Sequence, residues 1–328
     1  MTAGALSMPA KAAAPRRTFR GRVAARLLLA LAAVLRRLPD RVLHRLAHRV
    51  GGLLYAFQPR RRQLVQDNLR QVCSYLVAVG LASGRVELAA TDERALRGLT
   101  RDAFGHYVRS YLEGAIVPAY DGPELATRVQ PDDPALAERV MGAAGSGQRP
   151  LIFVGLHFGA IELPALWSIR VRGLHLTAPM ETVANPDLQA YFERTRGEAG
   201  LTLVPTDGAG RILAQRLANS EAVAIVADRV VSGVGARVKL FGRETRLPLG
   251  PAALALETGA PAWAVATRRT GWGEYRSELD PIELPASGTR RERLGGFMAN
   301  QARAFERLIA AAPEQWWAVF FPIWPDRR

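Results

Sequence analysis

Short apolar runs alternate with segments of helical periodicity over the second half of the chain. The apolar runs are rich in residues that favour strands, and they predict strands at Leu151–Leu156, Leu174–Ala178, Leu201–Val204, Ala222–Ala227, Ala236–Leu240 and Ala262–Ala266. Helices are expected over Pro186–Ala199, Ala209–Asn219, Pro251–Glu257 and Arg290–Ala312. This alternation predicts an α/β fold in which a mostly parallel sheet is flanked by helices.

The first part of the chain has a different pattern, in which apolar residues and arginines share the same helices. An apolar run extends from Val23 to Leu35, and a second helix begins at Pro39-Asp40 with arginines at positions 41, 45 and 49. The run is shorter than the roughly 20 residues that a membrane span needs. Two successive basic amphipathic helices favour an interfacial membrane anchor. A helical hairpin that packs on the domain, with its arginines in water, has the same pattern.

These patterns divide the chain into three parts. Residues 1–22 are rich in Ala, Pro and Arg, without apolar periodicity, and we expect a loose basic tail. A helical, membrane-associating region is expected over 23–134, with a long helix at Asp92–Ile116. The α/β core is expected over 135–328, packed with the helical region as one unit.

Composition and charge narrow the classes of partner. The 328 residues are 48% apolar and 23% charged, which is typical of a globular protein, but the formal net charge is +14. Such a charge requires an anionic partner or surface. The chain has no zinc-finger spacing, RNP-like motif or basic region with heptads, so we expect an anionic membrane surface and no nucleic acid. The single cysteine, Cys73, excludes an internal disulfide and a CxxC metal site.

One stretch carries the main candidate chemistry. The apolar strand Leu151–Leu156 ends in His157, Gly159 follows in a turn, and a helix is expected from Ala160 with Glu162 in its first turn. At the carboxyl end of a strand, His157 lies where open α/β sheets place their sites. A carboxylate behind an imidazole fixes its tautomer and stabilises the imidazolium, so the pair can remove a proton from a hydroxyl. An interior histidine held by a carboxylate for structure alone is the alternative.

Other charged residues follow predicted strands at the same edge. Glu181 follows one of them, and the helix after Asn185-Pro186 contains Arg196. Asp228 and Arg229 end another apolar strand. A third group, Arg243 and Arg246, precedes a helix that starts at Gly250-Pro251, where free backbone N–H groups could hold an anion. Each group could instead be a solvated or capping set of charges.

The ordered series resembles a bacterial family that includes the lipid A lauroyl/myristoyl acyltransferases and the phosphatidylinositol mannoside acyltransferases. The matching pieces are His157 with Glu162 as an H-x4-D/E motif, Glu181 before Asn185-Pro186, Arg196 before Gly200, Ala227-Asp228-Arg229, Phe241-Gly242 with Pro248-x-Gly250-Pro251, and a Trp-rich end. The chain departs from the family at Ala160-Ile161, where Asn-Trp is common, and at Leu240, where an aromatic residue often stands. These departures bear on the identity of the acceptor more than on the type of reaction.

The resemblance implies an αβα sandwich of the glycerolipid-acyltransferase type. His157, oriented by Glu162, would deprotonate a glycolipid or phospholipid hydroxyl, which attacks an acyl-CoA or an acyl-carrier protein thioester. Neither a metal nor a cofactor is expected. The substrate-binding residues would be Glu181, Arg196, Asp228, Arg229, Arg243 and Arg246, and the additional glutamate of the mannoside branch would be Glu244. The enzyme would lie on the cytoplasmic face of the inner membrane.

Two other readings of the sequence stay open. One is a metal-dependent hydrolase that uses His157, Glu162 and Asp228 as ligands. The other is a membrane-binding protein without catalytic activity.

Overall fold

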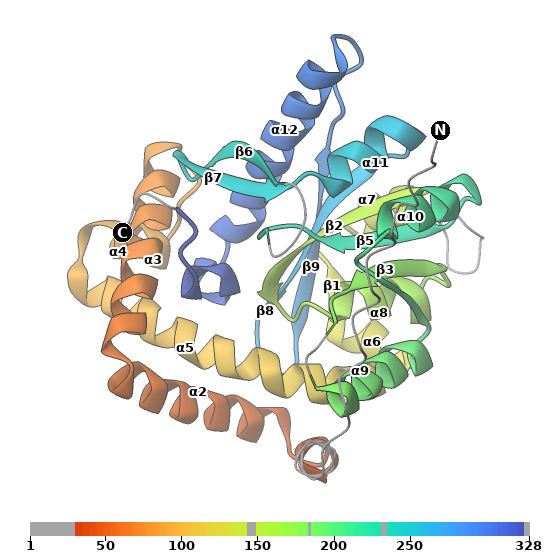
Figure 1. Cartoon of the computed structure of the whole chain (residues 1–328). Coiled ribbons are helices and arrows are strands. Elements are labelled where there is room, and N and C mark those ends of the chain that lie inside the picture. Colours follow the sequence, from red (N-terminus) through yellow and green to blue (C-terminus); the bar gives the residue numbers. More distant parts are fainter. Residues whose placement is uncertain (1–29, 143–148, 183–184, 231–234, 325–328) are drawn as a thin grey trace, which may run out of the picture.

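The computed structural model describes residues 30–142, 149–182, 185–230 and 235–324 (Figure 1). The tail expected at 1–22, and residues 23–29 of the apolar run that follows it, lie outside these ranges. Helices dominate the first part of the described chain, namely α2 (Asp40–Phe57), α3 (Pro59–Ala78), α4 (Arg85–Thr91), α5 (Glu93–Ile116) and α6 (Gly122–Arg128), with the 3-10 turn η1 (Val117–Ala119). The helix predicted at Asp92–Ile116 is confirmed, and the Asp92 side chain caps it by accepting from the Arg94 N–H.

A seven-stranded sheet forms the centre of the molecule. Its order is β1 (Val129–Pro131), β9 (Tyr275–Ile282), β8 (Ala262–Arg269), β2 (Leu151–Gly159), β5 (Ala222–Val226), β3 (Leu176–Met180) and β4 (Leu201–Pro205). All neighbours are parallel except β8 and β9. The predicted α/β class with a mostly parallel sheet is therefore confirmed. Strand β1 precedes residue 135, where the sequence pattern placed the start of the core.

One predicted strand belongs elsewhere. Residues 236–240 lie in β6 (Gly235–Leu240), which pairs with β7 (Arg243–Pro248) in a separate antiparallel hairpin. The two residues between these strands, Phe241 and Gly242, both have positive φ, at 49° and 75°. Positive φ at both central positions defines the tight hairpin turn whose twist matches paired strands. The chain therefore reverses at this point instead of entering the parallel sheet.

Helices cover both faces of the sheet. They are α7 (Pro134–Met141), α8 (Leu163–Arg170), α9 (Pro186–Glu198), α10 (Ala209–Ala218), α11 (Gly250–Thr258) and α12 (Arg290–Ala310), followed by the 3-10 turns η2 (Pro313–Gln315) and η3 (Trp317–Phe320). Alternate side chains of β2 point to opposite faces, as strand geometry requires. Ile152 and Val154 belong to the core cluster that includes residues of α3, α11 and α12, whereas Leu151 and Phe153 belong to the cluster that includes residues of α7 and α8. The result is a layered sandwich.

The sheet splits between β3 and β5. These strands pair only at Leu176↔Ala222 and Thr177↔Val223, whereas β3 stays paired with β4 as far as Met180↔Pro205. Beyond Thr177 the β3–β4 pair therefore diverges from β5. A splayed parallel sheet leaves a crevice at the carboxyl ends of its strands, where open α/β proteins bind ligands.

The turn after β2 requires a glycine. Gly159 has φ of +52°, and an added Cβ would lie 1.9 Å from the carbonyl oxygen of Thr267. Helix α8 starts at Leu163 instead of the predicted Ala160, because β2 continues through His157 to Gly159. Phe158 also forms a bridge to Trp316. Gly159 thus lets the strand end against β8 while His157 stays in extended backbone.

We predict that Gly159→Ala destabilises the protein, because the new Cβ meets backbone and the left-handed conformation disfavours alanine. The expected loss in unfolding free energy is at least about 2 kcal/mol. Gly98 in α5 is the matched control, since a Cβ there has open space and a helical backbone. Gly98→Ala should raise the unfolding free energy by about 1 kcal/mol. Urea denaturation of both variants measures the difference, and an unchanged midpoint for Gly159→Ala would contradict the steric account.

Candidate active site

Two polar side chains meet at the ends of adjacent strands. β2 and β5 pair through Gly155↔Val226, and the Ala227 N–H donates to the Gly155 carbonyl at 3.0 Å. Asp228 follows Ala227, two residues past the end of β5, and His157 lies two residues beyond Gly155 in β2. Because the strands are parallel neighbours, both side chains reach the same edge of the sheet.

The Asp228 carboxylate accepts three hydrogen bonds. Its Oδ1 lies 2.7 Å from Nδ1 of His157, and its Oδ2 accepts from the His157 backbone N–H at 3.0 Å and from Nε1 of Trp316 at 2.9 Å. An ionised carboxylate can only accept, so Nδ1 carries the proton and Nε2 is the free base of the neutral ring. The arrangement fixes both the orientation and the tautomer of the imidazole.

Burial and charge set the protonation of this pair. The Asp228 side chain is fully buried and that of His157 is 25% exposed. Burial acts to raise the pKa of Asp228, but the adjacent imidazole, together with the hydrogen bonds from Trp316 and the His157 backbone, outweighs it, so this pKa is held below its ordinary value. Burial acts to lower the pKa of His157, but the Asp228 carboxylate outweighs it and the pKa is raised. His157 is therefore a stronger base than an isolated histidine.

The structure gives Asp228 the position that the sequence pattern assigned to Glu162. Glu162 is the residue before α8, and its Oε1 accepts from Nη2 of Arg196 at 2.7 Å and from Nε at 3.2 Å. Because β2 runs on to Gly159, the Glu162 carboxylate faces α9 and not the Nδ1 of His157. Asp228, which we expected to bind substrate, lies behind His157, where a substrate cannot reach it.

A cavity of about 930 Å³ opens beside His157 at the split in the sheet. Its lining includes five residues that the sequence pattern had singled out, namely His157, Glu162, Glu181, Arg196 and Arg229. The rest of its lining includes apolar side chains of the diverging strands and of α8, α10 and α11, among them Leu203, Leu213, Ile225 and Leu254. Volume and lining are typical of a site for a ligand with a long apolar part.

Besides the buried Asp228, three predicted site residues lie outside this cavity. Arg246 donates to the Gly235 carbonyl across the β6–β7 hairpin at 3.0 Å, and Arg243 lies over the Trp324 ring at 5.9 Å. Glu244 is exposed on the same hairpin. The antiparallel turn explains this, because it carries the three side chains away from the parallel sheet. The helix start that follows them does reach the cavity, where Gly250 lines the wall and Pro251 occupies the first turn of α11.

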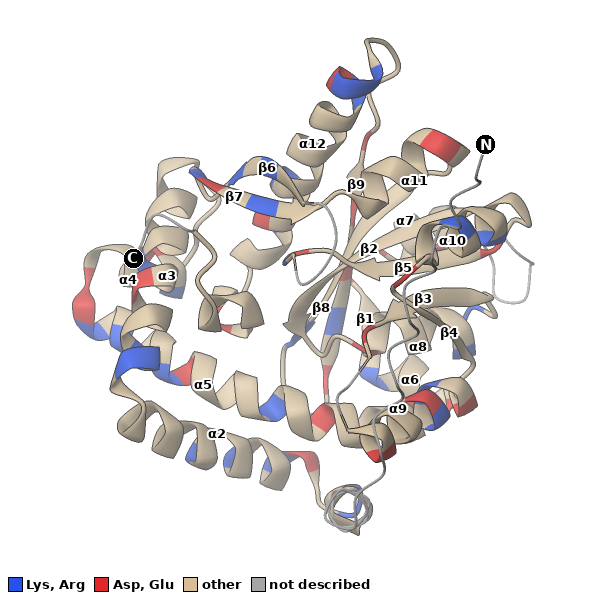
Figure 2. Ribbon diagram, viewed as in Figure 1, with Lys and Arg blue, Asp and Glu red and all other residues tan. Residues whose placement is uncertain are grey.

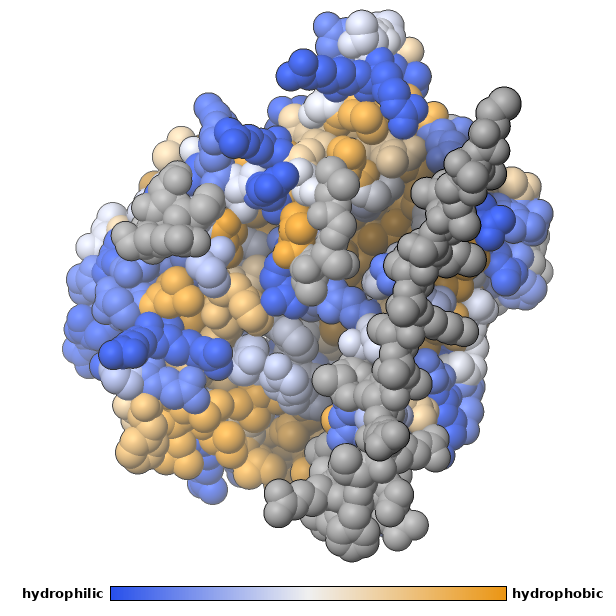
Figure 3. Space-filling view, in the orientation of Figure 1, coloured by the Kyte–Doolittle hydropathy of each residue, from blue (hydrophilic) through white to orange (hydrophobic). Residues whose placement is uncertain are grey.

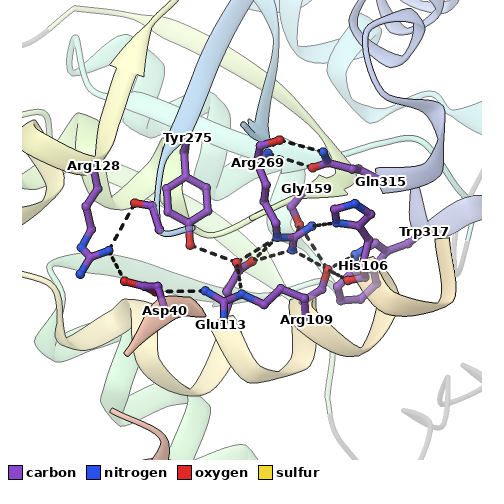
Figure 4. A network of polar contacts seen from close by, with 12 residues as sticks. Asp40, His106, Arg109, Glu113, Arg128, Gly159, Arg269, Tyr275, Gln315 and Trp317 are labelled. Atoms are coloured by element: carbon purple, nitrogen blue, oxygen red, sulfur yellow. Dashed lines mark hydrogen bonds and ion pairs between the residues drawn. The ribbon is translucent and has the colours of Figure 1, made fainter. Parts of the chain in front are cut away.

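Buried polar side chains of α5 and β8 form a network that supports the turn after His157 (Figure 4). Arg269 of β8 donates to the Gly159 carbonyl and to Ser110 Oγ, both at 2.8 Å. Its guanidinium also pairs with Glu113 of α5, which accepts from Arg109 at 2.9 Å and from the Tyr275 hydroxyl at 3.0 Å. Burial acts to raise the pKa of Glu113, but the charges and hydrogen bonds of Arg269 and Arg109 together outweigh it and the pKa is lowered.

The same network extends to the N-terminal helices. Arg109 also donates to Asp40 at 3.1 Å, and Arg128 donates to Asp40 at 2.6 Å. Asp40 is the first residue of α2. A continuous chain of charged contacts therefore joins the start of α2, through α5, to the backbone beside His157. Helical region and sheet are tied together at the site.

The residues that the structure describes contain no group of three or more His, Cys, Asp or Glu side chains that could hold a metal ion. The three residues that a metal-dependent hydrolase would use as ligands do not form one such group. Asp228 bonds to His157, while Glu162 bonds to Arg196.

Sequence reasoning missed several residues of the site. Trp316 donates to Asp228, and the Trp317 ring lies 5.7 Å from the His157 ring, centroid to centroid. Arg269 and Glu113 support the turn after His157 but stand in unremarkable sequence contexts. The detectable signal was an acid at the end of an apolar strand, Ala227-Asp228, combined with the Trp-rich end. Pairing them with His157 requires the strand order.

Comparison with known proteins supports the predicted resemblance. Residues 92–322 match the model of a family described as "Bacterial lipid A biosynthesis acyltransferase". The chain is similar to the phosphatidylinositol mannoside acyltransferase of Mycolicibacterium smegmatis, with 27% identity over 225 residues, or 66% of this chain and 70% of that protein. It is also 30% identical over 167 residues to the protein of the same name from Mycobacterium tuberculosis H37Rv, covering 49% of this chain and 50% of that one.

The family match extends from α5 to η3 and therefore includes the whole sheet, His157, Asp228 and the cavity. It confirms the resemblance that the ordered motifs indicated. The chain belongs to the family of bacterial lipid A biosynthesis acyltransferases.

Proposed function

We propose that the protein transfers a fatty acyl chain from an acyl thioester to a hydroxyl group of a glycolipid, with His157 as the general base. The observation that carries this proposal is the His157–Asp228 pair at the mouth of a largely apolar cavity. The family supports acyl transfer in lipid biosynthesis. Both relatives named above are phosphatidylinositol mannoside acyltransferases, which supports a glycolipid as the acceptor.

The chemistry follows from the tautomer. Nε2 of His157 accepts the proton of the acceptor hydroxyl, whose oxygen attacks the thioester carbonyl carbon and forms the new C–O bond. Asp228 stabilises the imidazolium that results, because its negative charge lies 2.7 Å from Nδ1. When the tetrahedral intermediate collapses, the C–S bond breaks and the imidazolium returns its proton to the leaving thiolate. The products are an ester and a free thiol.

Two features near His157 suit the negative charges of this reaction. Arg229 lines the cavity and has no acidic partner among the described side chains; its guanidinium lies over the Phe321 ring at 4.3 Å. The first turn of α11 opens on the cavity at Gly250, and its unpaired backbone N–H groups favour an anion. We assign the start of α11 to the developing oxyanion or to the phosphates of the donor, acyl-CoA or acyl-carrier protein, and Arg229 to an anionic group of the acceptor.

The split in the sheet would receive the acyl chain. Apolar side chains of β4, β5 and α11 line the inner cavity, including Leu203, Ile225 and Leu254. A fatty chain in this space would leave water, with a gain of about 0.8 kcal/mol for each buried CH₂ group. The thioester carbon would then lie beside His157.

Helix α2 is our candidate for contact with an anionic membrane surface. Leu46, Val50, Leu53 and Phe57 are exposed, Phe57 at 80%. Figure 3 shows a broad apolar area over this part of the molecule, and Figure 2 shows basic residues along the same helix. No helix within the described ranges has the length and hydropathy of a membrane span. Apolar and basic residues together favour attachment in the interface, at the cytoplasmic leaflet, where a thioester donor and a lipid acceptor can meet.

The proposed function predicts that His157→Ala abolishes most acyl transfer. Loss of a general base costs about 10²–10⁴-fold in rate. The substitution also removes one hydrogen bond of the buried Asp228 carboxylate, so the fold must be measured alongside activity. The assay is transfer from palmitoyl-CoA to phosphatidylinositol mannoside, followed by mass spectrometry of the lipid product. Circular dichroism and thermal unfolding serve as controls for the fold. Wild-type turnover in folded His157→Ala protein would end the proposal.

The membrane surface makes a separate prediction. Replacing Leu53 and Phe57 by serine should weaken binding to vesicles of anionic phospholipid by at least about tenfold, because two exposed apolar side chains no longer leave water. The matched control replaces Val77 and Leu88, which are 43% and 61% exposed on α3 and α4. Vesicle flotation measures both variants at low and high salt, which screens the arginine contribution. Equal flotation of the two double variants would show that α2 is not the attachment site.

A further inference from the structure

An aromatic surface lies beside His157, on the side of α5. The Trp317 ring is 5.7 Å from the imidazole, and the Tyr111 ring stacks on Trp317 at 5.4 Å with an interplanar angle of 25°. Tyr111 is 58% exposed although its ring contacts Trp317. An aromatic pair, with Tyr111 exposed and Trp317 half-buried, therefore leads from solvent to the reacting base.

Hydrogen bonds fix this pair in place. The Trp317 indole N–H donates to Ser110 Oγ at 2.7 Å, and Arg269 donates to the same oxygen at 2.8 Å (Figure 4). The Tyr111 hydroxyl lies 3.0 Å from that of Tyr107, whose ring stacks on Phe320 at 4.3 Å. These contacts hold both rings before any ligand arrives, so binding would not have to order them.

Two cations lie within electrostatic reach of the pair. Arg229 lines the cavity and lies over the Phe321 ring at 4.3 Å. The positive charges of Arg61 and Arg229 act to lower the pKa of the Tyr111 hydroxyl, although burial prevails and raises it to about 12. Neither guanidinium has an acidic partner among the side chains that the structure describes, and Arg61 is exposed. Aromatic faces next to unpaired guanidinium groups are suited to a ligand that carries both a sugar ring and a phosphate.

We propose that Tyr111 and Trp317 form the acceptor subsite, where a sugar ring of an anionic glycolipid stacks while Arg61 and Arg229 face its phosphate. The C–H face of a pyranose is weakly positive and packs well against the negative face of an aromatic ring. Stacking beside His157 would bring a sugar hydroxyl toward Nε2. This proposal rests on the proposed function for its reaction but makes its own statement about binding.

The experiment measures binding of the deacylated headgroup of phosphatidylinositol dimannoside, which is soluble and reports no membrane attachment. Tyr111→Leu should weaken its Kd about tenfold, since an aromatic contact contributes on the order of the 1.4 kcal/mol that this factor represents. Tyr111→Phe retains the ring and should stay within about twofold of wild type. Trp272→Leu is the matched control, because Trp272 is 55% exposed on the turn between β8 and β9 and is not one of the rings that contact His157, Trp317 or Tyr111. It should bind as wild type.

A second comparison tests the cations. Arg61→Gln should weaken binding of the phosphorylated headgroup but leave binding of free mannobiose unchanged, because only the former carries the phosphate charge. Steady-state kinetics complete the test: Tyr111→Leu should raise KM for the glycolipid acceptor, with little change in KM for palmitoyl-CoA.

Wild-type affinity of Tyr111→Leu for the headgroup would overturn the proposal, as would equal losses in Tyr111→Leu and Trp272→Leu. If Tyr111→Leu instead reduces flotation with glycolipid-free vesicles by the same factor, the pair is an interfacial anchor and not a sugar site. The headgroup titration does not depend on turnover. Failure of the wild-type enzyme to acylate the glycolipid would therefore count against the proposed function alone.

Discussion

The buried carboxylate of Asp228 is the constraint on which the rest of the site depends. A charge without exposure to water is tolerated only when it is paired and hydrogen-bonded. Asp228 meets that requirement with the His157 backbone, the His157 ring and Trp316, which come from two distant parts of the sequence. The same three contacts that make the buried charge tolerable also fix the imidazole tautomer. Stability and chemistry therefore impose the same geometry, and the end of β2, the end of β5 and the Trp-rich segment must assemble together.

The two sides of the His157–Asp228 pair differ in structure. The divergence of β3 from β5 opens an apolar space next to His157, whereas the network from Asp40 to Arg269 keeps the opposite side of the site rigid. Removing one member of such a network leaves an uncompensated buried charge, which typically costs about 3–5 kcal/mol. Because the network begins at the first residue of α2, charged contacts connect the helix with the exposed apolar face to the turn after His157.

Much of the fold could be predicted from the sequence, because buried strands are continuous apolar runs and their ends shift by only a few residues. Strand β9 was missed since Arg276, Glu278, Asp280 and Pro281 give it the composition of a loop. The hairpin was missed because Phe241-Gly242 is not the usual Asn-Gly turn signal, although both residues have the positive φ that such a turn requires. His157, Glu181, Arg196 and Arg229 were found as strand-end or motif residues. The partner of His157 was not, because sequence spacing favours Glu162 and only the strand order β2-β5 brings Asp228 alongside.

The most direct test of this account is the titration of His157 itself, followed by ¹⁵N NMR of the imidazole in the wild type, Asp228→Asn and Glu162→Gln. The account predicts a pKa above the ordinary value of about 6.5 and a neutral ring protonated at Nδ1 in the wild type. In Asp228→Asn the pKa should fall, because burial then acts without the compensating charge. Glu162→Gln should leave the tautomer unchanged, since Glu162 is bonded to Arg196. A ring protonated at Nε2, or a pKa that responds to Glu162 and not to Asp228, would contradict the central claim.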